Sequence, residues 1–221
     1  MIATLFDFDG VLVDSEPVHL AAFNDVLAPR GIVIGEREYA ERFLSLDDAG
    51  VFRTVLSHSG KTLREEEVRA LVAAKSPHFM ARFEEAFRVF PGAADLIARR
   101  ARLGPVGIVS GSLEREIAFA LEKMGVSGEV RFVVSAEKAA VSKPDPMPYQ
   151  HALRELSALG HAAAAVAIED SPGGVRSAKG AGLRCVAVTH SCSRDELERA
   201  GADATAGDLA AVTDALLDGG A

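Results

Sequence analysis

Pairs of acidic residues follow two of the apolar runs in this sequence. Asp7 and Asp9 stand at the end of the first run, and Glu169 and Asp170 follow a later one. Carboxylates that are packed together repel one another, and the repulsion raises their pKa values. A hard divalent cation relieves that repulsion, and a set of ligands made only of oxygen atoms favours Mg²⁺. We therefore predict that these acids gather around a magnesium ion.

A second group of polar residues has the chemistry needed to hold a phosphate. Ser110-Gly111-Ser112 follows another apolar run, and Lys143 stands in the segment SKPDP. Hydroxyls, backbone amides and an ammonium group bind phosphate oxygens, which Mg²⁺ also binds. The two groups together indicate phosphoryl transfer. The sequence contains neither a GxxxxGK[ST] loop nor a GxGxxG fingerprint, so it does not indicate a nucleotide-dependent reaction.

Strands and helices that alternate along the chain must position these residues. Short apolar runs predict strands at Ala3–Phe8, Val106–Val109, Arg131–Val134, Ala164–Ile168 and Arg184–Val188. Amphipathic stretches predict helices at Ala93–Leu103, Leu113–Met124, Pro148–Leu159, Gly173–Ala181 and Leu209–Leu217. Alternation of this kind is typical of a Rossmann-like α/β fold, in which a parallel sheet binds ligands at the carboxyl ends of its strands. The acids, the hydroxyls and Lys143 should therefore meet at one edge of the sheet.

Residues 15–88 interrupt the alternation, because their apolar residues recur only at helical spacing. We expect an all-helical domain inserted after the first strand. The predicted domains are a Rossmann-like catalytic core of residues 1–14 and 89–221, and a helical cap of residues 15–88.

Composition limits the classes of partner. The 221 residues include 24 Lys and Arg against 32 Asp and Glu, which gives a formal net charge of −8. An acidic chain without a basic cluster argues against nucleic acid. We see no apolar stretch long enough to span a bilayer and no basic start of a signal peptide, so we expect a cytoplasmic protein, monomeric by default.

Four motifs carry a resemblance to a known family. DFDGVLVDS, VSGS, SKPDP and IEDSPGG resemble, in order and spacing, the motifs of the haloacid dehalogenase superfamily, and the match is closest to its β-phosphoglucomutase-like phosphatase branch. The resemblance implies that Asp7 is the nucleophile and forms an aspartyl-phosphate. It implies that Asp9 is the general acid and base, which favours cleavage of a P–O bond because expulsion of a halide needs no proton.

The resemblance also implies the remaining assignments at the site. The cation would be held by Asp7, the backbone carbonyl of Asp9, Glu169 and Asp170. The phosphate would be held by Ser110, Gly111 and Lys143, and in the cap His19 and Lys75 would face the substrate.

The function that we expect is a Mg²⁺-dependent phosphatase acting on a small phosphorylated metabolite such as a sugar phosphate. The first alternative is a phosphomutase of the β-phosphoglucomutase type, which needs a second phosphate clamp in its cap. Asp47-Asp48 stands where that mutase has a Ser-Arg pair and would repel a second phosphate, although Arg42 or Arg53 could replace the clamp. A non-catalytic sensor of phosphorylated ligands is a further alternative, which the pair Asp7 and Asp9 disfavours.

Some motif residues also have a purely structural interpretation. Ser15 and Ser112 are candidate N-caps of the helices that follow them, and Asp145 with Pro146 is typical of a helix start. Gly173-Gly174 could serve close packing or the geometry of the loop.

Overall fold

The structure is a computed structural model that describes residues 2–44, 46–58, 63–139, 141–161 and 164–219. Contacts between residues divide the chain into two compact units, one made of Met1–Asp14 with Val89–Ala221 and one of Ser15–Arg88. The roles of these units as catalytic core and cap remain predictions. In the described ranges no helix combines the length and apolar character needed to cross a membrane.

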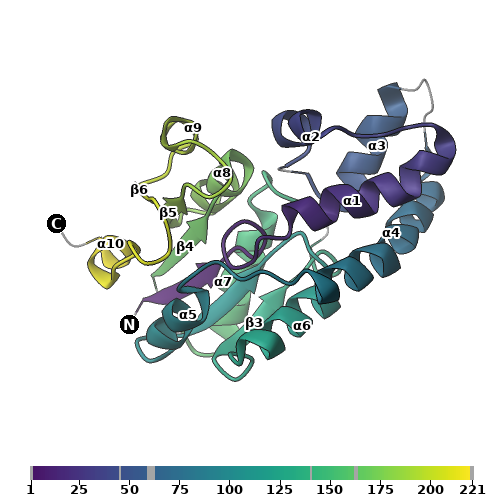
Figure 1. Cartoon of the computed structure of the whole chain (residues 1–221). Coiled ribbons are helices and arrows are strands. Elements are labelled where there is room, and N and C mark those ends of the chain that lie inside the picture. Colours follow the sequence, from purple (N-terminus) through teal and green to yellow (C-terminus); the bar gives the residue numbers. More distant parts are fainter. Residues whose placement is uncertain (1, 45, 59–62, 140, 162–163, 220–221) are drawn as a thin grey trace. The chain divides into compact units, whose positions relative to one another are not determined.

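A six-stranded parallel sheet forms the centre of the first unit (Figure 1). Its order is β3-β2-β1-β4-β5-β6, and every neighbouring pair is parallel. The strands are β1 (Ala3–Phe6), β2 (Val106–Val109), β3 (Val130–Val134), β4 (Ala165–Glu169), β5 (Arg184–Val188) and β6 (Ala204–Ala206). Strands β1, β2 and β4 are buried along their whole length, which explains why their sequences show little polar alternation.

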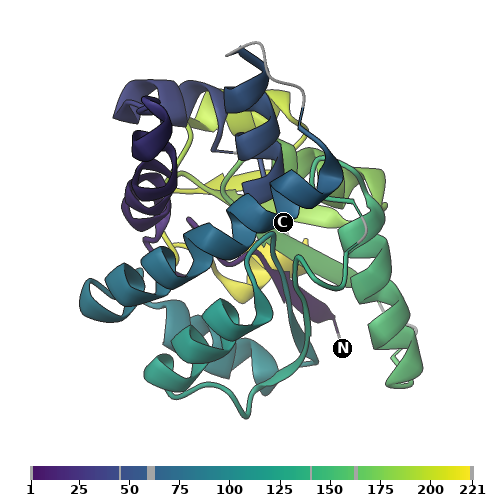
Figure 2. The ribbon, with the colours of Figure 1, turned by 90° about the vertical axis from the view of Figure 1, so that its right-hand side faces the viewer.

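Helices of the first unit lie on both faces of this sheet (Figures 1 and 2). They are α5 (Ala93–Ala101), α6 (Glu114–Met124), α7 (Met147–Ala158), α8 (Pro172–Gly180), α9 (Arg194–Arg199) and α10 (Asp214–Asp218). Helix α7 packs on β2 and β3, and α8 packs on β4 and β5. Leu5, Tyr149 and Val175 belong to the buried apolar cluster between these helices and the sheet.

The order of the strands reverses between β1 and β4. Strand β1 leads to β2 and β3 on one side of the sheet, whereas β4 leads to β5 and β6 on the other. In open α/β sheets, ligands bind outside the carboxyl ends of the strands at this switch point. The residues that follow β1 and β4 therefore occupy the position at which folds of this kind bind ligands.

The second unit consists of helices in its described residues. These are α1 (Glu16–Leu27), the 3₁₀ turn η1 (Ala28–Arg30), α2 (Glu36–Arg42), α3 (Asp48–His58) and α4 (Glu65–Glu85). Helix α4 packs against both α1 and α3. Buried side chains such as Phe23, Phe52 and Leu71 form its own apolar core, in which the rings of Phe23 and Phe52 meet edge to face at 5.2 Å. This core gives the insert a source of stability of its own.

The α/β fold with a helical insert is confirmed, and β2 and β5 begin and end as predicted. Strand β6 and helix α9 were not predicted. Strand β6 has only three residues and lies at the edge of the sheet, and α9 buries only Leu197, so neither has a clear apolar period. Helix α10 begins at Asp214 instead of Leu209, because the hydroxyl of Thr213 caps it by accepting a hydrogen bond from the Leu216 N–H at 3.1 Å.

Candidate active site

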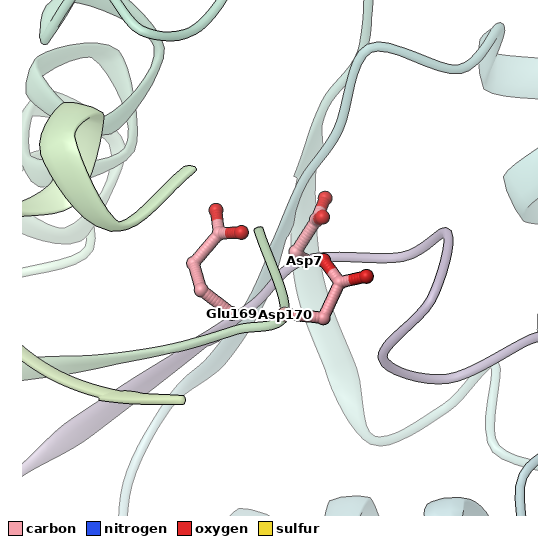
Figure 3. A group of neighbouring side chains, drawn as sticks. All are labelled: Asp7, Glu169 and Asp170. Atoms are coloured by element: carbon pink, nitrogen blue, oxygen red, sulfur yellow. The ribbon is translucent and has the colours of Figure 1, made fainter. Parts of the chain in front are cut away.

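Three acidic side chains meet at the switch point of the sheet. Asp7 is the first residue after β1, Glu169 is the last residue of β4, and Asp170 comes next. One oxygen from each carboxylate lies within 4.8 Å of the corresponding oxygens of the other two. Figure 3 shows Glu169 and Asp170 leaving the end of β4 in different directions, with Asp7 beside them. The exposed fractions are 8% for Asp7, 0% for Glu169 and 3% for Asp170, and such burial is costly unless positive charge is supplied.

Lys143 supplies part of that charge. Its Nζ lies 2.8 Å from Oδ1 of Asp7 and 2.6 Å from Oε1 of Glu169. Burial alone would lower the pKa of Lys143, but attraction to Asp7 and Glu169 outweighs burial and raises it. Burial, followed by the charge of Glu169, raises the pKa of Asp7 to about 8, although Lys143 acts in the opposite direction. Lys143 therefore offsets only part of the rise in the pKa of Asp7, and a further cation would favour the ionised carboxylate.

Two glycines let the acids approach the backbone. A Cβ atom at Gly10, where φ is +74°, would lie 1.9 Å from Oδ2 of Asp170. A Cβ atom at Gly174, in the first turn of α8, would lie 1.8 Å from Oε2 of Glu169. A side chain at either position would force the neighbouring carboxylate to move, which agrees with the close-packing role suggested for Gly174.

The donor set fits a divalent cation. Oε2 of Glu169 is buried and has no hydrogen-bond partner among the described residues. Protein donors therefore leave part of this carboxylate unused, and carboxylate oxygens are the ligands that Mg²⁺ prefers. The buried cluster of Asp7, Glu169 and Asp170 could bind a metal ion in this way.

The carboxylate of Asp9 lies with the serines that follow β2. Its Oδ2 accepts a short hydrogen bond from the hydroxyl of Ser112 and a longer one, at 3.4 Å, from that of Ser110. The N–H of Ser112 in turn donates to Oγ of Ser110 at 2.9 Å, and the exposed Gly111 lies between the two serines. This carboxylate is not part of the buried triad. Contact between the cation and the backbone carbonyl of Asp9 therefore remains a prediction.

The interpretation of Ser112 as an N-cap is wrong. Helix α6 begins at Glu114 and Leu113 is its N-cap residue, while the hydroxyl of Ser112 hydrogen-bonds to Asp9. Ser15, by contrast, does stand at the N-cap position of α1. The helix start predicted at Asp145 is also confirmed, because its Oδ1 accepts a hydrogen bond at 2.8 Å from the N–H at the start of α7.

Two residues around the site were not predicted from the sequence. Tyr149 donates a hydrogen bond of 2.6 Å to Oε1 of Glu169, and the hydroxyl of Ser191 donates a short one to Asp170. Burial, and then the charge of Glu169, raise the pKa of Tyr149. Ser191 follows β5, so the rule that predicted the other residues at strand ends could have found it. For Tyr149 the only signal was a hydroxyl on the apolar face of a predicted helix, which needs a partner.

In the helical unit, His19 and Lys75 lie side by side. Nζ of Lys75 is 2.7 Å from Nδ1 of His19 and forms a short ion pair with Asp48. Lys75 is only 1% exposed, and its Nζ lies 4.2 Å from the centroid of the Phe23 ring, a favourable contact for a cation. Asp48 thus neutralises at close range the ammonium group that sequence reasoning expected to face the substrate.

Comparisons with known proteins show which family the chain resembles. A family model described as haloacid dehalogenase-like hydrolase matches residues 4–188. Protein CbbY of Cereibacter sphaeroides is 34% identical over 208 residues, which cover 91% of this chain and 89% of that protein. A phosphoglycolate phosphatase of Rhodospirillum rubrum is 27% identical over 219 residues, which cover 97% of this chain and 90% of that protein.

Solved structures share the fold over nearly the whole chain. The crystal structure of CbbY from Rhodobacter sphaeroides in complex with phosphate has a TM-score of 0.85 at 31% identity, and the match covers 99% of this chain and 100% of that one. Another structure of CbbY, also with a TM-score of 0.85, holds xylulose-(1,5)bisphosphate; it is 30% identical, and the match covers 98% of this chain and 99% of that one. A β-phosphoglucomutase from Clostridium difficile has a TM-score of 0.85 at 21% identity, covering 100% of this chain and 97% of that one, a likeness of fold alone.

Proposed function

The chain belongs to the haloacid dehalogenase-like hydrolase family, and on that premise we propose that it is a Mg²⁺-dependent phosphatase that hydrolyses a small sugar phosphate through an aspartyl-phosphate on Asp7. The resemblance seen in the four sequence motifs is thereby confirmed at the level of the family. Relatives of the chain include a phosphoglycolate phosphatase and CbbY, which has been solved with a sugar bisphosphate.

One observation supports the proposal most strongly. The carboxylate of Asp7 stands at the switch point beside Lys143, Glu169 and Asp170, whereas the carboxylate of Asp9 is held apart by Ser110 and Ser112. Hydrolysis through a covalent intermediate needs one carboxylate to attack phosphorus and a second to carry protons. Two acids with different surroundings can divide these tasks.

The first step is attack by a carboxylate oxygen of Asp7 on phosphorus. A new P–O bond forms to Asp7 while the bond to the leaving oxygen breaks, and Asp9 donates its proton to that oxygen. Lys143 and the groups at Ser110 and Gly111 hold the other phosphate oxygens. A divalent cation, when bound, screens the negative charge that Asp7 and the phosphate present to each other.

The second step returns the enzyme to its starting state. Asp9, now ionised, takes a proton from a water molecule, and the oxygen of that water attacks phosphorus. The bond to Asp7 breaks, inorganic phosphate leaves, and Asp9 is again protonated.

We propose that residues 15–88 act as the cap and that His19 and Lys75 contact the substrate there. The ion pair between Lys75 and Asp48 leaves little net positive charge in this cluster, which suits the neutral hydroxyl groups of a sugar better than a second phosphate.

A monomeric state and a cytoplasmic location remain predictions.

The ion pairs of two other cationic residues in the helical unit disfavour a phosphomutase. Arg42 and Arg53, the two candidates for a second phosphate clamp, are engaged in ion pairs: Arg42 with Glu38 at 2.9 Å and Arg53 with Glu65 at 2.7 Å. Because each arginine already pairs with a carboxylate, neither is positioned to bind a second phosphate. Incubation with glucose 1-phosphate and a trace of its bisphosphate separates the two functions, because a mutase yields glucose 6-phosphate and a phosphatase yields free phosphate.

A screen of phosphorylated metabolites for phosphate release tests the proposal. The panel includes phosphoglycolate, pentose and hexose phosphates and a sugar bisphosphate, each with Mg²⁺ and with a chelator. We expect release from a sugar monophosphate in Mg²⁺, no release in the chelator, and none from Asp7→Asn. Turnover that is indifferent to the chelator, or that survives in Asp7→Asn, contradicts the proposal. A non-catalytic sensor would release no phosphate from any member of the panel.

A further inference from the structure

Glu169 is held by two donors on one of its oxygens. Nζ of Lys143 and the hydroxyl of Tyr149 both hydrogen-bond to Oε1, each at 2.6 Å. Oε2 is buried without a hydrogen-bond partner among the described residues. The carboxylate therefore has a fixed side, which faces protein donors, and a side with unused lone pairs.

Tyr149 can fix this orientation because its own position is rigid. The residue is 0% exposed, and its ring belongs to the apolar cluster between α7, α8 and the sheet, with Leu5 and Val175. Packing of this density leaves the hydroxyl oxygen little freedom. The carboxylate of Glu169 must therefore adapt to the hydroxyl, rather than the hydroxyl to the carboxylate.

The same tyrosine also lies beside the ammonium group that links the acids. Nζ of Lys143 is 5.2 Å from the centroid of the Tyr149 ring and bridges Asp7 at 2.8 Å and Glu169 at 2.6 Å. Without the hydroxyl, Lys143 would be the only donor to Oε1 in the part of the chain that the structure describes. The ammonium group could then move towards Glu169 and away from Asp7, and the carboxylate of Glu169 could rotate.

We propose that Tyr149 is a positioning residue for the cation site, whose hydroxyl orients the Glu169 carboxylate and keeps Lys143 shared between Glu169 and Asp7. Tyr149 itself contacts neither the cation nor the substrate. This inference rests on the proposed function, because it takes Glu169 to face a divalent cation. Partners that orient the ligands of a metal contribute to its affinity, and their loss typically costs about 10- to 100-fold.

The chain contains a matched control. It has only two tyrosines, and the other, Tyr39, donates a hydrogen bond of 2.7 Å to Oε2 of Glu16 within the helical unit. Tyr149→Phe and Tyr39→Phe therefore remove the same hydroxyl from the same kind of partner. Only the first substitution touches the acidic cluster.

The test measures Mg²⁺ affinity directly. Isothermal titration of the metal-free protein gives the dissociation constant, and turnover of p-nitrophenyl phosphate against Mg²⁺ concentration gives the apparent KM for Mg²⁺ and the kcat at saturation. In Tyr149→Phe we expect both constants for Mg²⁺ to rise about 10- to 100-fold while kcat at saturating Mg²⁺ changes much less. In Tyr39→Phe the constants should stay within about 2-fold of wild type, the scatter we allow for a site without coupling.

A second measurement covers the case in which Tyr149→Phe fails to fold. In the Tyr39→Phe background, 3-fluorotyrosine labels Tyr149 alone, and its ¹⁹F resonance can be followed during a Mg²⁺ titration. We expect the resonance to shift with the same dissociation constant as the titration heat. A resonance that ignores Mg²⁺, a folded Tyr149→Phe with unchanged affinity, or equal losses in both variants would overturn the inference. Absence of Mg²⁺ binding by the wild type would instead contradict the proposed function.

Discussion

Replacing Gly174 with alanine tests how tightly the site is built around Glu169. The new Cβ atom would lie 1.8 Å from Oε2 and 2.4 Å from Oε1 of Glu169, whereas ordinary contacts begin at 3.4 Å. The carboxylate must retreat by more than an ångström. Such a movement breaks its hydrogen bonds of 2.6 Å from Lys143 and Tyr149.

The size of the effect follows from those two bonds. Hydrogen bonds to a charged group contribute about 1.5–3 kcal/mol each, so their loss costs about 3–6 kcal/mol. Replacing a helical glycine with alanine stabilises the helix by about 1 kcal/mol, which offsets part of this cost. We therefore expect Gly174→Ala to lower the free energy of unfolding by about 2–5 kcal/mol and to weaken Mg²⁺ binding.

Unfolding by urea in the presence of a chelator measures the change in the free energy of unfolding. A double-mutant cycle serves as the control. In a Glu169→Ala background no carboxylate opposes the new methyl group, so Gly174→Ala should be neutral or stabilise by up to about 1 kcal/mol. An equal cost in both backgrounds would show that crowding of Glu169 is not the cause. A Gly174→Ala protein with wild-type stability and Mg²⁺ affinity would refute the geometry itself.

Other expected outcomes concern the two aspartates and the cation. Asp9→Ala should lower kcat about 10²- to 10⁴-fold for an alkyl phosphate and far less for p-nitrophenyl phosphate, because nitrophenolate leaves without a proton; steady-state rates on both substrates test this. In a chelator, the melting temperature of the wild type should fall as the pH rises towards about 8, because the folded protein keeps a proton on Asp7 that the unfolded chain releases above 3.8. Asp7→Asn should remove that part of the pH dependence, and an identical slope in the variant would count against the raised pKa. Mg²⁺ should raise the melting temperature, more at pH 8 than at pH 6, because it binds the ionised carboxylates; differential scanning fluorimetry checks the sign.

The elements that carry the site could be predicted because each has a strong signal. Strands β1, β2 and β4 are buried on both faces, so their sequences are unbroken apolar runs, and polar residues begin where the strands end. Strand β6 is different. Its three residues, from Ala204 to Ala206, include a single β-branched side chain and pair with one neighbour only. Tertiary pairing, rather than local preference, makes that segment a strand.

The rule that ligands bind at strand ends also explains which site residues could be found. Asp7, Glu169 and Asp170 follow directly from the strand order, and the structure brings them together with Lys143. Lys143 could be placed by the same rule, because its segment follows β3 and precedes α7.

Side-chain orientation was beyond the reach of sequence reasoning. The turn of the Asp9 carboxylate towards Ser112, and the hydrogen bond from Tyr149 to Glu169, depend on rotamers and on helix placement over the sheet. Spacing along the chain carries no signal for either contact. The same is true of Asp48, which pairs with a lysine 27 positions away.

Trapping the phosphorylated enzyme shows whether Asp7 carries the phosphoryl group during turnover. A substrate found in the screen, labelled with ³²P, is mixed with enzyme and Mg²⁺, quenched in acid within one turnover, digested, and the labelled peptide sequenced by mass spectrometry. We expect one phosphoryl group on Asp7 in the wild type and none in Asp7→Asn. Label on another residue, or a full turnover of free phosphate from an enzyme that never carries label, would contradict it.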